Sequence, residues 1–134
     1  MKIVFASLLF LISSAALAQT PDSVLVDVNT IYDVVDLPAQ PNGGLTAFFK
    51  TIATNIQYPA DARKNGIAGK VFVEFVIEAD GTIRSENVRI AKSVSKSIDK
   101  EAKRVVLLTS PWTPAKKGDK NVRSRRTLPI TFNM

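Results

Sequence analysis

The stretch QYPADARKNGIAGKVFVEFVIEADGTI, residues 57–83, decides the fold of this chain. It opens on a Tyr-Pro pair and runs through a short helical pattern, over residues 59–65, to Gly66. Residues 70–78 then alternate as a strand does. One face of that strand is wholly apolar and carries Val71, Val73, Phe75 and Ile77. Asp80-Gly81 supplies the positive-φ geometry of a tight hairpin, so a second strand is predicted over residues 82–91.

An amphipathic helix is predicted on each side of this hairpin. In the first, residues 45–56, the apolar side chains recur at helical spacing: Leu45, Phe48, Phe49, Ile52, Ala53 and Ile56. The second begins at Ser97, a predicted N-cap. Its inward stripe is predicted to be Ile98, Ala102, Val105, Val106 and Thr109. Pro111 ends this helix, and Trp112 is expected to lie as a lid over the core.

The C-terminal part of the chain is predicted to be a polar loop over 116–121 and a third strand over 122–133. Pro129 lies inside that strand and has no N–H, so the strand is expected at the edge of the sheet or with Pro129 where no bond is needed. Residues 19–43 permit short strands at 24–28 and 31–35. The predicted fold class is α+β, with two main helices packed on one face of a small three-stranded antiparallel sheet.

The N-terminus has the features of a secretory signal peptide over residues 1–18. Lys2 precedes an apolar run, and Ala16-Leu17-Ala18 forms a small-residue cleavage site. The alternative is an uncleaved inner-membrane anchor, although the run is shorter than the roughly 20 residues that a spanning helix needs. Residues 19–41 are then a short connector and 42–134 one domain. The chain has no cysteine, so packing must hold it together.

Charge is distributed unevenly along the chain. Residues 19–83 carry 4 basic and 8 acidic side chains, whereas residues 84–134 carry 13 basic and 4 acidic ones, a net of +9. Such asymmetry indicates either a polyanion-binding face or a solvated helix face with a lysine-rich turn. The clustered cations near the C-terminus keep the first interpretation open: Lys116, Lys117, Lys120, Arg123, Arg125 and Arg126.

The sequence predicts no catalytic residue, no metal site and no cofactor. The chain has neither histidine nor cysteine, and its acidic residues are scattered singly. Glu74 and Glu78 share a strand face but lie about 13 Å apart, too far to act as a coupled pair. Two S-x-x-K matches, at Ser93 and Ser97, lack the companion motifs of serine acylases. Few aromatics are interleaved with the basic residues, so no nucleic-acid partner is expected.

The last strand offers a different kind of site. An edge strand presents unpaired backbone groups and can accept a peptide as an added strand. Alternatively, Pro129 and the neighbouring arginines simply protect that edge from pairing. The residues alone do not choose between these two interpretations.

Taken in order, a set of residues resembles the C-terminal domain of TonB, the transducer that links the inner membrane to outer-membrane receptors. The match runs from about residue 38 to 132. It comprises Gly43-Gly44, Tyr58-Pro59, Ala62, Gly69, Val71, Phe75, Asp80-Gly81, Val88, Ala102, Trp112-Thr113-Pro114, Gly118, Val122 and Pro129-Ile130-Thr131-Phe132.

The resemblance implies a periplasmic domain that captures an extended peptide, the TonB box, from the plug of an outer-membrane receptor. The peptide adds beside the last strand, which here matches Ser124, Arg125, Arg126, Thr127, Leu128, Pro129, Ile130, Thr131 and Phe132. Framework roles are implied for Tyr58, Pro59, Gly69, Gly81, Trp112 and Pro114, and catalysis for none.

Two departures from the family pattern bear on function. A full transducer keeps an anchor, which couples to the ExbB–ExbD motor, and a long proline-rich spacer. Here the apolar start is expected to be cleaved, and the short connector could not cross a periplasm. The chain is therefore expected to bind without transducing, unless its N-terminus is retained. The alternatives are a basic module that binds the envelope and a homodimer formed through the free edge.

Overall fold

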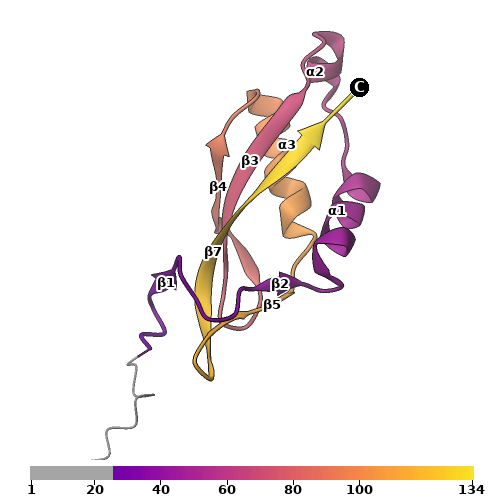
Figure 1. Cartoon of the computed structure of the whole chain (residues 1–134). Coiled ribbons are helices and arrows are strands. Elements are labelled where there is room, and N and C mark those ends of the chain that lie inside the picture. Colours follow the sequence, from indigo (N-terminus) through magenta and orange to yellow (C-terminus); the bar gives the residue numbers. More distant parts are fainter. Residues whose placement is uncertain (1–25) are drawn as a thin grey trace, which may run out of the picture.

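The computed structural model describes residues 26–134 and shows an α+β arrangement (Figure 1). The predicted signal peptide and the start of the first predicted strand lie outside these residues. In chain order the elements are β1 (Ile31–Tyr32), β2 (Gln40–Pro41), α1 (Gly44–Asn55), α2 (Ala60–Lys64), β3 (Gly69–Ile77), β4 (Ile83–Lys92), α3 (Lys96–Leu107), β5 (Trp112–Thr113), β6 (Ala115–Lys117) and β7 (Lys120–Phe132). Among the helices of this described part, none has both the length and the apolar character needed to span a membrane.

Three long antiparallel strands form the body of the sheet, as the alternating pattern predicts. The β3–β4 hairpin turns at Gly81, and β7 pairs with β3 from Gly69↔Phe132 to Ile77↔Ser124. The predicted three-stranded sheet is nevertheless too simple. Two-residue β1 pairs in parallel with β7, β6 forms a hairpin with β7, and β2 pairs with β5 in a separate ribbon. The sheet is therefore mixed, and its main strand order is β1-β7-β3-β4.

The predicted polar loop over residues 116–121 is wrong, because this segment is a β-hairpin. Lys117 and Lys120 are paired across a two-residue turn in which Gly118 adopts φ +61°. A left-handed residue matches the twist of a tight hairpin, which is why glycine suits this position.

The N-terminal connector packs against this hairpin. The N–H groups of Asp36 and Leu37 both donate to the Lys116 carbonyl at 3.0 Å. In return, the Gly118 N–H donates to the Asp36 carboxylate at 2.6 Å. Residues before position 42 are therefore part of the fold.

Both long helices form where the periodicity predicts them, and the short helix α2 lies within the predicted 59–65. The cap of α3 differs from prediction: Ser95, not Ser97, accepts the Ile98 N–H at 3.3 Å. Ser95 has the extended backbone of an N-cap, whereas Ser97 already lies in the first turn. Asp99 reinforces this start by accepting the Val94 N–H at 3.0 Å.

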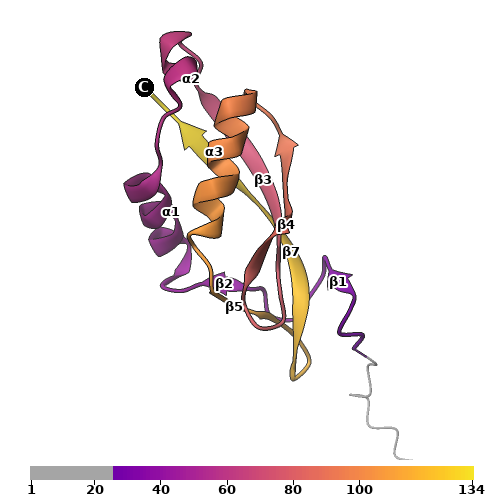
Figure 2. The same cartoon turned by 180° about the vertical axis from the view of Figure 1, so that it is seen from behind.

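The core lies between the helices and the apolar face of β3. The two views show α3 crossing one face of the sheet and α1 lying beside the C-terminal half of β7 (Figures 1 and 2). Trp112 is 3% exposed and packs edge-on against Phe48 and Phe75, with ring centroids 5.6 and 5.4 Å away. Trp112 therefore closes the core, as the sequence predicts.

Candidate functional site: the free edge of the last strand

The two flanks of β7 are occupied very differently. One flank pairs with β6 from Lys120 to Val122 and with β3 from Ser124 to Phe132. The other flank pairs with β1 at Arg123 and Ser124 only. From Arg125 to Phe132, no strand within residues 26–134 covers this second flank, which we call the free edge.

Pro129 indicates which backbone groups face the free edge. In an antiparallel ladder, alternate residues direct both their N–H and C=O to the same neighbour. The register with β3 continues through Phe72↔Pro129, and proline has no N–H to donate. Pro129 therefore faces away from β3, and so do Arg125, Thr127 and Thr131. In the parallel pairing with β1, the Arg125 N–H faces the Tyr32 carbonyl, because Ser124 directs its own backbone groups to β3. The free edge therefore offers amide donors at Thr127 and Thr131 and acceptors at all four residues.

Side chains alternate along the same strand. Leu128, Ile130 and Phe132 are buried on the helix side, whereas Thr127 and Thr131 are exposed on the open face. Any strand added at the free edge would continue this alternation, with every second side chain turned toward the helix layer.

Helix α1 forms a wall next to the free edge. A groove of about 200 Å³ lies between them, and its lining is largely apolar: Phe49, Ile52, Ala53, Ile56, Pro129, Ile130 and Thr131. On α1, Phe49 and Leu45 remain 41% and 39% exposed although both belong to the apolar stripe. Sequence periodicity places them on the stripe but cannot tell that the stripe extends past the edge of the sheet.

The free edge ends at Arg125. The Arg125 guanidinium binds Asp33, which directly follows β1, at 2.8 Å, and lies 3.8 Å from Glu74. Ser124 is only 3% exposed and has strand partners on both sides, Tyr32 and Ile77. Of the nine strand residues implied by the family resemblance, the structure thus places eight, Arg125–Phe132, along the free edge.

The C-terminal arginines do not form a free cationic patch. Arg123 binds Glu78 at 2.6 Å and donates to the Asn29 carbonyl at 2.9 Å. Arg126 donates to the Ala39 carbonyl at 2.7 Å and stacks over Trp112. Burial lowers the pKa of the Arg126 guanidinium below its ordinary value. These contacts hold the strand in place. Carboxylates neutralise Arg123 and Arg125, whereas the carbonyl that binds Arg126 leaves its charge in place.

The structure places the residues with implied framework roles at packing contacts and at the ends of elements. The Tyr58 hydroxyl donates to the Ile67 carbonyl, and its ring packs on Phe132 at 5.8 Å. At Gly81, which has φ +89°, an added Cβ would lie 2.0 Å from the Trp112 carbonyl oxygen. At Gly69, which has φ +151°, it would meet the Val94 side chain at 3.2 Å. Pro59 precedes α2, and Pro114 connects β5 to β6.

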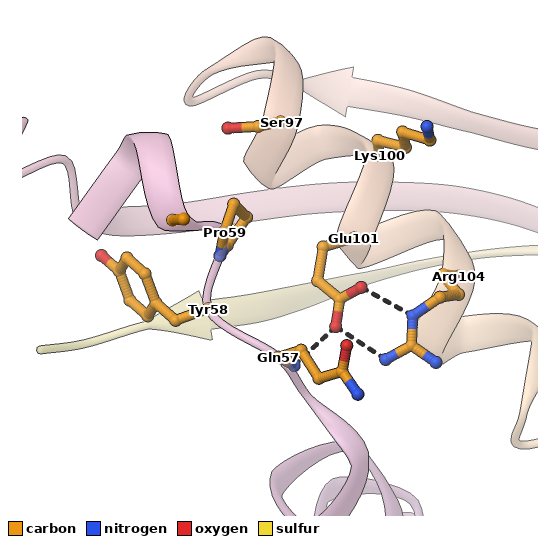
Figure 3. Close-up of a pocket in the computed structure, with 8 residues that line it drawn as sticks. Gln57, Tyr58, Pro59, Ser97, Lys100, Glu101 and Arg104 are labelled. Atoms are coloured by element: carbon orange, nitrogen blue, oxygen red, sulfur yellow. Dashed lines mark hydrogen bonds and ion pairs between the residues drawn. The ribbon is translucent and has the colours of Figure 1, made fainter. Parts of the chain in front are cut away.

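A second cleft, of about 470 Å³, separates the Tyr-Pro segment from α3 (Figure 3). In its centre the Glu101 carboxylate accepts hydrogen bonds from Arg104 at 2.6 and 2.8 Å and from the Gln57 N–H at 2.6 Å. Burial by itself raises the pKa of Glu101, but these hydrogen bonds and the charge of Arg104 lower it below its ordinary value. Glu101 therefore ties the α1–α2 connection to α3. Within the described residues, no three acidic side chains gather as a metal site would need.

Comparison with known proteins identifies the family. The model of the Gram-negative bacterial TonB protein C-terminal family matches residues 54–134, more than half of the chain. The chain belongs to the TonB C-terminal family. Domains of this family are periplasmic, serve transport rather than catalysis, and interact with outer-membrane receptors. No curated protein sequence matches the chain.

Solved TonB domains are similar in structure. A solution structure of the Helicobacter pylori TonB C-terminal domain (residues 179–285) aligns with 22% identity and a TM-score of 0.50, covering 67% of this chain and 79% of that one. A second structure of that domain (residues 194–285) aligns with 24% identity and a TM-score of 0.49, covering 66% and 91%. The Pseudomonas aeruginosa TonB C-terminal domain aligns with 30% identity and a TM-score of 0.46, covering 58% and 77%. The first of these supports the TonB-type fold.

Proposed function

We propose that this TonB-family domain binds an extended peptide of an outer-membrane receptor, the TonB box, as an added strand on the free edge of β7. The observation that carries the proposal is the row of outward backbone groups between Arg125 and Thr131. An unpaired edge binds extended peptides through main-chain hydrogen bonds, which is how β-augmentation provides affinity.

The arrangement around the free edge favours capture of a strand over simple protection of the edge. Natural proteins blunt an exposed edge with inward-pointing charges, bulges or a covering element. Between Thr127 and Phe132 the described part of the chain carries no charged side chain, and its pairing with β3 shows no register shift. Pro129 removes only one of the outward donors and leaves its carbonyl as an acceptor.

The test is a titration of the chain with receptor plug-domain peptides, followed by backbone amide shifts. Binding at the free edge should move the amides of Thr127 and Thr131 most, because their N–H groups acquire partners. Shifts that spare this edge at millimolar peptide would exclude the proposed site. Sedimentation at several concentrations distinguishes peptide capture from pairing with a second copy, since an unpaired edge also invites self-association.

The same proposal places the chain in the periplasm, after removal of residues 1–18. A chain cut after Ala18 would carry no anchor, so it would bind receptors without transmitting force from an ExbB–ExbD motor. The N-terminal mass of the exported protein tests this step. Gln19 as the first residue supports a diffusing domain, and a retained Met1 supports a tethered one.

A further inference from the structure

We infer that the groove between α1 and the free edge is a specificity pocket that takes an aliphatic side chain of the added strand. This inference rests on the proposed strand addition and deepens it. Phe49, Ala53 and Ile56 of the α1 wall would select the peptide by its side chains. The backbone of β7 would pair with any extended peptide, whatever its sequence.

The position of the groove follows from the alternation along β7. On the helix side, Leu128 and Ile130 are buried in the core layer. A guest strand on the free edge would have its own helix-side residues in the same layer, one strand further out. The space at that position is the groove lined by Phe49, Ala53 and Ile130. Every second guest side chain on this side therefore enters or flanks the groove.

The chemistry of the groove selects the class of side chain. Its α1 wall offers only aliphatic and aromatic carbon, from Phe49, Ile52, Ala53 and Ile56. A charged guest side chain there would lose water without gaining a partner. Its volume of about 200 Å³ leaves room for a branched aliphatic group. The exposed ring of Phe49 would be covered by such a group, which accounts for a large aromatic side chain at this rim.

The opposite face of the guest strand meets different chemistry. Arg125, Thr127 and Thr131 alternate with the buried residues and lie on the open face of the sheet. The preferred partner is therefore an extended segment with aliphatic residues on one side and polar residues on the other. The free edge from Arg125 to Thr131 fits a segment of about seven residues, because strands pair residue by residue.

The experiment uses capped seven-residue peptides in which valine and threonine alternate. Each valine is replaced in turn by leucine or alanine, and affinity is measured from the free-edge amide shifts. Two variants of the full chain are compared: Ala53→Leu, which fills the groove, and Thr54→Leu, a matched control one residue further along the exposed side of α1.

At one apolar position, the leucine peptide should bind the unmodified chain about tenfold more tightly than the alanine peptide, because leucine buries several more carbon atoms in the groove. Ala53→Leu should abolish this preference, and Thr54→Leu should keep it. Equal responses of the two variants, with binding retained at the free edge, would overturn the pocket but leave strand addition standing. A lack of free-edge shifts with every peptide would overturn both.

Discussion

Trp112 shows how one residue connects distant parts of this chain. Its ring closes the core against Phe48 of α1 and Phe75 of β3, and its indole N–H donates to Thr109 at 3.0 Å. Its backbone N–H donates to the Gly81 carbonyl at 2.7 Å, so the segment after α3 is held against the β3–β4 turn. These contacts of Trp112 are structural, because they join α1, β3 and the β3–β4 turn.

Replacing Trp112 with alanine should reduce the free energy of unfolding by about 3–5 kcal/mol, the usual cost of removing a large buried aromatic. Chemical denaturation measures this loss. Leu108→Ala is the control, because Leu108 is 48% exposed and should change stability little. A loss below about 1 kcal/mol for Trp112→Ala would contradict its role in the core.

Glu101 makes part of the stability dependent on pH. Its pKa in the folded chain is lowered below the ordinary carboxyl value, so its contribution to stability is complete above that value. The contribution is lost as the pH falls from about 4.5 through the folded pKa. Glu101→Gln should be less stable than the unmodified chain at pH 7, and the difference should shrink on acidification. Parallel unfolding curves at pH 7 and pH 3.5 test this. A difference that stays constant or widens at low pH would argue against it.

At the scale of elements, sequence pattern predicts the long elements and misses the short ones. Helix α1 and strand β3 carry regular apolar periods, which predict the element and the face that turns toward the core. Strands β1, β2, β5 and β6 have two or three residues each, so their pairing is set by the partner they meet. The N-cap of α3 is not predictable from sequence for a similar reason. Ser95 and Ser97 are equally good N-caps in sequence, and the Val94–Asp99 hydrogen bond distinguishes them only in three dimensions.

The sequence predicts the edge strand of the candidate site but not its limits, for the same reason. Pro129 indicates an edge strand from sequence alone. The sequence does not predict that β1 pairs with Ser124 or that Phe49 stays exposed at the groove. Both depend on contacts between segments far apart in the chain, which no local pattern encodes.

The alternation of β7 predicts opposite effects of proline at adjacent positions. Thr131 directs its N–H outward, as Pro129 does, so Thr131→Pro should remove a donor for the peptide and change stability little. Ile130 directs its N–H to β3, so Ile130→Pro should leave a buried carbonyl without its donor and cost about 1–3 kcal/mol or more. Peptide titration and denaturation of both variants measure the two effects. Equal destabilisation by both would show that the outward assignment is wrong.

At the scale of the whole molecule, the N-terminal connector completes the domain and limits its binding edge. Ala39 is fully buried in the core, and Pro41 pairs with Trp112. The same connector places β1 beside Arg123 and Ser124 and provides Asp33 for Arg125. The predicted boundary at residue 42 would remove all of these contacts, although the family model begins only at residue 54.

A chain that begins at residue 42 should therefore be less stable than one that begins at residue 26, and it should bind along a longer edge. Loss of the buried connector side chains should cost roughly 2–4 kcal/mol, because Ala39, Tyr32 and Val35 all pack against the core. Amide shifts on peptide addition should then extend back to Arg123, whose flank β1 no longer covers. Asp33→Asn in the longer chain is the matched control. It removes the ion pair with Arg125 but keeps β1, so the shifts should still begin at Thr127, the first N–H that β1 leaves free. Equal stability of the two chains, or shifts that begin at the same residue in both, would show that the connector neither completes the core nor limits the edge.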